Sequence, residues 1–256
     1  MSRPFAAGEK ALLLDPRGRR YLVTLAAGGE FHCHTGIIPH DSLIGEDEGV
    51  GVKTTLGSPF RAVRPTLSDF VLEMPRGAQV IYPKDLGPIL TLADIFPGAR
   101  VLESGIGSGA LSMTLLRAGA DVVGYELRED FANRAVANVR SFLGDDVLDR
   151  YHVELRDTYE GIDETGLDRM LLDLPEPWRV VPHAAGALRS GGILLAYCPS
   201  IVQVSQFRSA LDVNGFAMAQ TVEVLNRTWK VEGNAVRPDH RMVAHTGFLT
   251  HARLLA

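Results

Sequence analysis

Residues 100–126 read RVLESGIGSGALSMTLLRAGADVVGYE, and this stretch decides the fold of the chain. A short apolar run ends in Glu103 and is followed by a glycine-rich loop over 105–108. Gly109 then opens a stretch of apolar residues at helical spacing, and a second apolar run ends in Glu126. The order of strand, glycine turn, helix, strand and acid is typical of the opening of a parallel α/β sheet that binds a nucleotide-like ligand.

The spacing of the glycines discriminates between two kinds of ligand. A nicotinamide site favours G-x-G-x-x-G, which aims a helix N-terminus at a pyrophosphate. Here an acid precedes the loop, and the pattern runs Glu103, Gly105, Gly107, Gly109. A carboxylate ahead of the loop would repel a pyrophosphate, but it can hold the ammonium group of S-adenosylmethionine (SAM), which carries no phosphate. The pattern therefore favours a methyl donor, with Glu126 placed to accept hydrogen bonds from the ribose. Another kind of nucleotide site and a purely structural glycine turn are the alternatives.

The composition is that of a globular protein, with 256 residues, 46% of them hydrophobic and 22% charged. That length allows one large domain, or a medium domain with a small appendage. The sequence contains no apolar run of the ~18 residues that a membrane span needs, and its N-terminus does not read as a secretory signal. Since Cys33 and Cys198 lie far apart and form no CxxC pair, we expect a cytoplasmic protein without disulfides and without a membrane partner.

Residues 1–65 predict a small β-rich N-terminal domain, because short apolar runs alternate with turn sequences such as Asp-Pro-Arg-Gly at 15–18. Acids balance its arginines and lysines, and the whole chain carries a net charge of -5. A nucleic-acid ligand would therefore need a local basic patch, and both an RNA-facing surface and a plain solvated face stay open for this domain. His32 and His34 can share one face of a strand, but no second ligand pair follows at a zinc spacing, so we predict no metal site.

Residues 66–97 are expected to link this domain to the sheet. After a short capped helix, an extended piece at 79–85 leads into a second helix that we expect to end at Pro97-Gly98. Because the segment directly precedes the first strand of the sheet, it can fold over the mouth of the cofactor site. Tyr82 and Asp85 are candidates for the substrate side of that site, and the alternative is a connector that packs only for stability.

Residues 98–256 predict a Rossmann-like domain. Asp157 and Thr158 follow an expected strand at 151–155, where a carboxylate and the next backbone N–H can read the N6 and N1 edge of an adenine. The alternative for this pair is a turn or a helix cap. Further strands are expected to end at Tyr197 and to cover 216–225 and 243–255, with helices at 130–143 and 201–213 and a loop at 228–241.

A second informative stretch is LDRMLLDLPEPW at 167–178. It reads as a near-continuous apolar strand, buried on both faces, that ends at Asp173 and a loop stiffened by two prolines. In open α/β sheets ligands bind beyond the carboxyl ends of the strands, so Asp173 lies where the methyl acceptor should be. Trp178 offers either an aromatic surface or a core residue.

Three motifs in order carry a resemblance to a known family: YPKD at 82–85, ESGIGSG at 103–109 and DLPEPW at 173–178. The chain resembles the bacterial and archaeal tRNA (adenine-58-N1)-methyltransferases over nearly its whole length, including AYCPSIVQV at 196–204 and RPDHRMVAHTGFL at 237–249. The resemblance implies an α/β fold of the class I SAM-dependent methyltransferase type with a small N-terminal β domain. It also implies SAM as cofactor without a metal, tRNA as partner, and a homotetramer.

The resemblance implies roles for individual residues where the motifs match. Asp173 matches the family's acceptor-site aspartate, and Tyr82 and Tyr197 match aromatic residues near the target base. Leu-Pro follows Asp173 where relatives often have Leu-Met or Met-Leu, and Pro-Ser follows Cys198, but neither departure touches the carboxylate. Together with the glycine pattern, the expected donor-binding positions are Ile81, Glu103, Gly105, Gly107, Ser108, Gly109, Ala110, Leu111, Glu126, Phe131, Asp157, Thr158 and Asp173 itself.

These observations predict SAM-dependent methylation of N1 of adenosine 58 in the T-loop of tRNA. Adenine N1 brings its own lone pair, so the enzyme must mainly align an in-line displacement. Asp173 would accept a hydrogen bond from N6 and stabilise the positive charge that develops on a base everted from folded tRNA. The alternatives are a class I methyltransferase of a small molecule or a protein, and a non-catalytic tRNA-binding subunit. The intact glycine pattern and Asp173 argue against a non-catalytic subunit.

Overall fold

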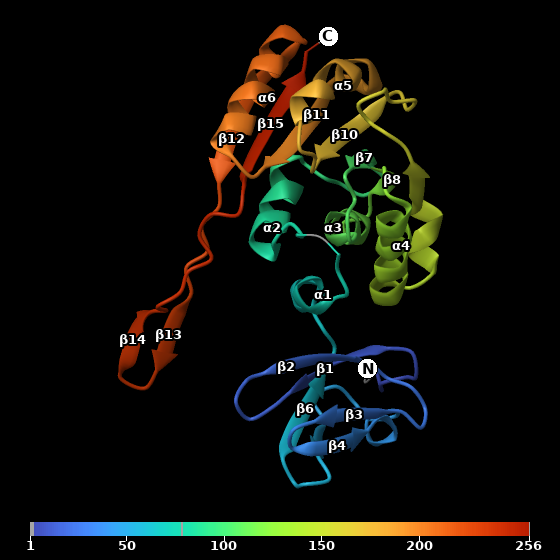
Figure 1. The fold of residues 1–256 in the computed structure, drawn as a ribbon, viewed down its shortest axis with the longest axis vertical. Helices are drawn as coiled ribbons and strands as arrows, with labels where there is room; N and C mark the ends of the chain where they lie inside the picture. Colours follow the sequence, from blue (N-terminus) through green and yellow to red (C-terminus); the bar gives the residue numbers. More distant parts are fainter. Residues whose placement is uncertain (1–2, 78, 256) are drawn as a thin grey trace. The chain divides into compact units, whose positions relative to one another are not determined.

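The computed structural model describes residues 3–77 and 79–255. The chain forms two compact units, Met1–Pro75 and Arg76–Ala256 (Figure 1). The segment 66–97, expected to link two domains, is divided between them, with 66–75 in the first unit and 76–97 in the second.

The first unit is a small β structure closed by one helix. Its four-stranded antiparallel sheet has the order β2-β1-β6-β5, and a separate hairpin, β3–β4, packs on the same apolar core through Ile38. The helix α1 starts at a capping box, in which Thr66 and Asp69 each accept the other's backbone N–H. The elements are β1 Lys10–Leu14, β2 Arg20–Thr24, β3 Glu30–Cys33, β4 Gly36–Pro39, η1 His40–Ser42, β5 Gly51–Lys53, β6 Pro59–Val63 and α1 Leu67–Glu73.

The second unit is built on a seven-stranded sheet with the order β12-β15-β11-β10-β7-β8-β9. The strands from β11 to β9 run parallel, and β15 pairs antiparallel with both β11 and β12. The strands are β7 Arg100–Ser104, β8 Asp121–Glu126, β9 Tyr151–Leu155, β10 Leu167–Leu172, β11 Leu188–Cys198, β12 Phe216–Glu223 and β15 Phe248–Leu254. The helices are α2 Pro83–Leu92, α3 Ala110–Arg117, α4 Glu129–Leu143, η2 Asp146–Arg150, η3 Pro177–Arg179, α5 Val181–Ala187 and α6 Ile201–Val213.

Helices cover both faces of this sheet, with α2, α3 and α4 on one face and α5 and α6 on the other (Figure 1). Alternate residues of the central strands, such as Leu102 and Met170, join one apolar cluster with Val181 of α5 and Phe207 of α6. The expected α/β fold is thereby confirmed.

The sheet has a topological switch between β7 and β10. From β7 the chain winds outward through β8 and β9, and it then returns to place β10 on the other side of β7. Loops that leave the carboxyl ends of β7 and β10 therefore diverge and open a crevice, which is where open α/β sheets bind ligands. The two strand ends stay joined, because the Asp173 N–H donates to the Ser104 carbonyl at 2.9 Å.

The helix α2 ends at Leu92, earlier than the expected end at Pro97-Gly98. Asp94 adopts a left-handed conformation, with φ +50°, and the Ile95 N–H donates to the Leu90 carbonyl at 2.9 Å. This closing pattern is normally made by glycine. Here Arg169 of β10, only 2% exposed, supports it by donating to the Ala93 carbonyl at 2.5 Å and pairing with Asp94 at 2.7 Å.

The segment 228–241, expected to be a loop, contains a hairpin made of β13 Trp229–Glu232 and β14 Ala235–Pro238. Its turn is Gly233-Asn234, and Gly233 takes φ +52°. A Gly-Asn pair between two alternating runs is a hairpin signal, so the sequence did contain this information. Within residues 3–77 and 79–255, none of the helices has the length and apolar character that crossing a bilayer requires.

Candidate active site

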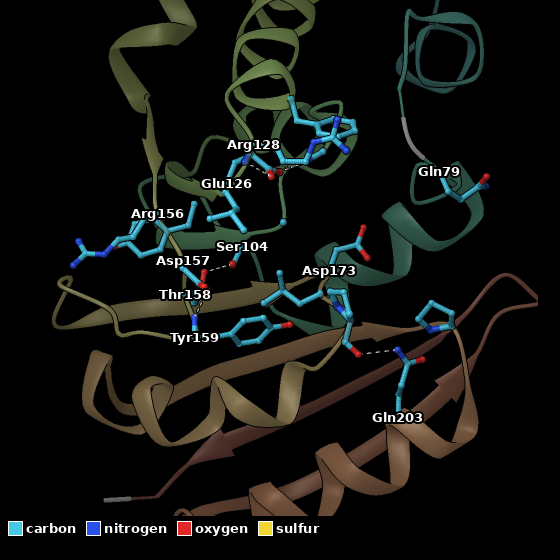
Figure 2. A pocket seen from close by; sticks show the side chains of 18 residues that line it. Gln79, Ser104, Glu126, Arg128, Arg156, Asp157, Thr158, Tyr159, Asp173 and Gln203 are labelled. Carbon is cyan, nitrogen blue, oxygen red and sulfur yellow. Dashed lines mark hydrogen bonds between the residues drawn. The ribbon is translucent and has the colours of Figure 1, made fainter.

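A cavity of about 690 Å³ lies at the carboxyl ends of β7, β8 and β10, beside the segment that follows β9 (Figure 2). Its wall includes seven of the residues predicted for the site: Gly105, Gly107, Glu126, Phe131, Asp157, Thr158 and Asp173. Segments far apart in the sequence therefore meet at the switch point between β7 and β10.

The glycines of the turn after β7 differ in what a side chain at each position would meet. Gly105 has φ +82°, and a Cβ there would lie 2.2 Å from the Asp173 carbonyl oxygen, so no other residue fits. Gly107 has φ +52°, and a Cβ there would meet no atom within 4 Å, so its backbone borders open cavity space. Gly109 precedes α3 and packs against Ala135 of α4, where a Cβ would come within 3.2 Å.

The Glu126 carboxylate is held at the end of β8 by two backbone N–H groups. Gly107 donates to one oxygen at 3.2 Å and Arg128 donates to the other at 3.1 Å. Both oxygens keep further lone pairs that can accept two neighbouring hydroxyls, as a ribose diol requires. Beside this group, the Arg128 guanidinium lies 4.0 Å from the centre of the Phe131 ring.

Asp157 and Thr158 follow β9, the strand next to β8, and also line the cavity. One Asp157 oxygen accepts the Tyr159 N–H at 2.9 Å, which is a local turn contact and leaves the second oxygen for a ligand. Thr158 is buried, and its hydroxyl hydrogen-bonds to the Ser104 hydroxyl at the end of β7. The wall is therefore tied directly to the strand that carries the glycine turn.

Asp173 is half-buried at the cavity wall, next to the glycine turn (Figure 2). Burial, together with the nearby Glu126 charge, raises the pKa of the Asp173 carboxyl to about 7. The loop that follows is held from two sides. The Glu176 N–H donates to the Tyr159 hydroxyl at 3.0 Å, and the Gln203 amide donates to the Pro175 carbonyl at 2.9 Å.

Glu103 lies behind the glycine turn and is not part of the cavity wall. It is 1% exposed, and burial raises the pKa of its carboxyl to about 8. Its Oε2 has no hydrogen-bond partner among the residues that the structure describes. A pKa near 8 favours the protonated carboxyl near neutrality, in which this buried group can itself donate a hydrogen bond.

Tyr197 and Asp85 belong to a buried network beside the cavity. The Tyr197 hydroxyl donates to the Thr246 carbonyl at 2.6 Å, and the Thr246 hydroxyl donates to Asp85 at 2.7 Å. Asp85 also pairs with Lys84 at 2.8 Å and is fully buried. Its carboxylate is thus engaged within the protein, as the connector interpretation expects. Burial raises the pKa of Tyr197 to about 12, so its hydroxyl stays protonated near neutrality.

The other predicted residues surround the site without forming its wall. Ile81, Ala110 and Leu111 are buried apolar side chains, each about 4% exposed, and Ser108 is buried with an unpartnered hydroxyl within the described part of the chain. Tyr82 is half-buried at the start of α2. The structure adds wall residues that the sequence did not indicate: Gln79, Ser104, Tyr125, Leu127, Arg128, Arg156, Tyr159, Leu174, Pro175, Pro199 and Gln203. No group of three or more metal-binding side chains occurs in the described ranges.

Several comparisons point to one family. The family model of the tRNA methyltransferase complex GCD14 subunit matches residues 61–236, and a TrmI-like N-terminal model matches residues 4–52. The chain is 40% identical over 245 residues to the tRNA (adenine(58)-N(1))-methyltransferase TrmI of Thermus thermophilus. This alignment covers 94% of this chain and 95% of that protein.

Solved structures agree with this match. A SAM-dependent O-methyltransferase from Thermotoga maritima is similar with a TM-score of 0.93 at 32% identity, over 98% of this chain and 95% of that one. The tRNA (m1A58) methyltransferase TrmI from Aquifex aeolicus has a TM-score of 0.87 at 28% identity, over 99% of this chain and 100% of that one. The expected SAM-dependent methyltransferase fold is confirmed, and the chain belongs to the GCD14/TrmI family.

Proposed function

We propose that this chain transfers the methyl group of SAM to N1 of adenosine 58 in tRNA. The observation that carries the proposal is Asp173, a carboxylate held at the cavity wall against the glycine turn by the contact between its N–H and Ser104. Membership of the GCD14/TrmI family supports the choice of tRNA.

The cavity fits the chemistry of SAM. Glu126 offers two oxygens to the ribose, Asp157 offers one to the adenine, and Phe131 supplies an apolar surface. Glu103 does not line the cavity, and we place it as a support of the glycine turn from behind. We place Ile81, Ser108, Ala110 and Leu111 as supporting residues behind this cradle. Bound SAM supplies a methyl group on a sulfonium that is already a good leaving group.

Residues of this chain align the adenine and stabilise the positive charge that develops on it. Asp173 accepts a hydrogen bond from the adenine N6 and thereby orients N1. As the ring gains positive charge, the ionised carboxylate stabilises it inside a site from which water is largely excluded. Tyr82 and Tyr197 provide aromatic surface for an everted base. The Tyr197 hydroxyl donates to the Thr246 carbonyl, so we propose that Tyr197 contacts the base through its ring and not through its hydroxyl. Residues 66–97 contribute to the mouth of the site through Gln79.

The deciding experiment uses unmodified tRNA made by transcription, SAM and the purified protein. Methylation is mapped as a reverse-transcription stop at position 58, with a transcript that carries guanosine at 58 as control. We expect Asp173→Ala to keep SAM affinity within a few-fold and to lower turnover by at least ~100-fold. Normal turnover of that variant would remove Asp173 from the mechanism. Absence of any stop with the native protein would favour a small-molecule or protein substrate, and absence of SAM binding by calorimetry would favour a non-catalytic subunit.

We also propose a cytoplasmic homotetramer, and the hairpin β13–β14 supports assembly. Trp229 and Val231 share one face of the hairpin with Val236 and Pro238, to which they are paired. Trp229, Val231 and Val236 are 58%, 71% and 62% exposed. An isolated two-stranded hairpin is marginally stable in water, so such a face calls for a partner surface. Sedimentation should give a mass four times that of the chain.

A further inference from the structure

The loop after β10 has few backbone donors of its own. Pro175 and Pro177 have no backbone N–H, so between Asp173 and Pro177 only Leu174 and Glu176 can donate besides Asp173 itself. The Glu176 and Pro177 carbonyls accept the Arg179 and Val180 N–H groups in the turn of η3, whereas the backbone nearer Asp173 is held by residues of other elements.

Three contacts tie this backbone to other elements, and all three partners line the cavity. Ser104 accepts the Asp173 N–H at 2.9 Å, Tyr159 accepts the Glu176 N–H at 3.0 Å, and Gln203 donates to the Pro175 carbonyl at 2.9 Å. Figure 2 shows Tyr159 and Gln203 reaching the loop from different elements. The Ser104 contact extends the pairing of β7 with β10, whereas the other two are made by side chains.

The Gln203 amide has only one possible orientation. It closes the capping box of α6, in which the Ser200 N–H donates to Oε1 at 3.0 Å. A backbone N–H can only donate, so the Gln203 oxygen faces Ser200 and its NH2 faces the Pro175 carbonyl. The helix cap thereby aims this donor at the loop.

The Tyr159 ring is likewise held in place. The Arg179 guanidinium lies 4.3 Å from the ring centre and pairs with Glu176 at 2.9 Å. Tyr159 also directly follows Asp157 and Thr158, the pair proposed to face the donor adenine. One residue therefore contacts the acceptor loop while being part of the donor wall.

We propose that the Tyr159 hydroxyl and the Gln203 amide are positioning groups, which hold the 173–177 loop so that Asp173 faces the methyl acceptor. This inference rests on the proposed function for its catalytic consequence. In structural terms it requires only that the two side chains restrain the loop.

The test uses two nearly isosteric variants of the full chain, Tyr159→Phe and Gln203→Glu. The first removes one hydroxyl and keeps the ring. The second keeps the capping acceptor for Ser200 and removes the donor to Pro175. Asn214→Asp is the matched control, because it makes the same amide-to-carboxylate change at the other end of α6, where Asn214 donates to the Ala210 carbonyl at 2.7 Å.

We expect each variant to lower kcat on tRNA about 10- to 100-fold, since small displacements of a catalytic group cost this much. SAM affinity should stay within about threefold. In Tyr159→Phe the acid limb of the kcat–pH profile should move to lower pH as Asp173 gains access to water, whereas the carboxylate added by Gln203→Glu to the same cavity wall acts in the opposite direction. The Asn214→Asp control should keep kcat and the pH profile. The proposal is overturned if both variants keep kcat within twofold, or if the loss is entirely in SAM affinity.

Hydrogen exchange of a peptide covering 173–178 gives a readout that does not need activity. Tyr159→Phe removes the acceptor of the Glu176 N–H, so exchange at this amide should quicken at least about 10-fold. Unchanged exchange in both variants overturns the proposal. If the native protein leaves tRNA unmodified while the variants still loosen the loop, the proposed function fails and the restraint of the loop stands.

Discussion

Asp173 is a carboxyl group in surroundings that disfavour its charge. Burial and Glu126 raise its pKa from 3.8 to about 7. A general electrostatic role requires the ionised form, so turnover should rise with pH through about 7. The same shift affects stability. The unfolded chain releases this proton near pH 4, while the folded chain keeps it, so the group lowers the free energy of unfolding, and thus stability, progressively as pH rises from about 4 to about 7.

Replacing Asp173 by asparagine should therefore stabilise the protein while it abolishes turnover. At pH 8 we expect Asp173→Asn to raise the free energy of unfolding by on the order of 1–3 kcal/mol, and near pH 4 the gain should vanish. Urea unfolding at the two pH values measures this difference. Asp121→Asn, at an exposed position at the start of β8, is the control. Equal stability of Asp173→Asn and the native protein at pH 8 would contradict the assigned environment.

At the scale of the elements, the glycine turn and the loop after β10 are packed backbone against backbone. Because Gly105 approaches the Asp173 carbonyl, the two loops cannot move independently. A side chain at this position would push the acceptor loop away from β7.

Gly105→Ala should consequently disturb the site far more than the backbone conformation alone explains. Gly98→Ala is the matched control, because Gly98 has φ +79° against +82° at Gly105, with no atom within 4 Å of a Cβ. We expect the control to cost about 1–2 kcal/mol of stability, the general cost of a left-handed alanine. Gly105→Ala should cost more and lower tRNA methylation at least ~100-fold. Thermal unfolding and single-turnover rates measure both, and equal behaviour of the two variants would refute the packing argument.

The elements also show what a sequence can and cannot predict. The glycine turn, Glu126 and Asp173 were predictable because each stands beside the strand that positions it. The end of α2 was not, because Asp94 takes the place of a glycine and Arg169, its partner, lies 75 residues away. Tyr159 and Gln203 were missed for the same reason. Nothing near them in the sequence indicates a loop that folding brings to them.

At the scale of the whole molecule, charge pairing constrains how RNA can be held. The arginines beside the cavity are paired with acids: Arg128 with Asp130, Arg156 with Asp163 and Arg179 with Glu176. The whole chain also carries a net charge of -5. We therefore expect tRNA to be bound by a surface that several subunits build together.

Charges placed on the apolar face of the β13–β14 hairpin should separate assembly from donor binding. We expect Val231→Lys with Val236→Lys to reduce the mass in light scattering, because both side chains would lie in the proposed contact. SAM affinity should stay near the native value, while kcat/KM on tRNA should fall at least about 10-fold. Leu56→Lys, at a turn residue that is 77% exposed, is the control for an added surface charge. An unchanged mass would remove the hairpin from the assembly.

Ser104 touches both halves of the reaction site, through its carbonyl to Asp173 and through its hydroxyl to Thr158. A relative that came to methylate a different base could not shift residue 173 without also straining the wall proposed to hold the adenosyl group. Relatives with different acceptors should accordingly differ in sequence at 174–178, where side chains can change without moving the end of the strand. Ser104 would then restrict changes of acceptor specificity through its two contacts, although it takes no part in the chemistry.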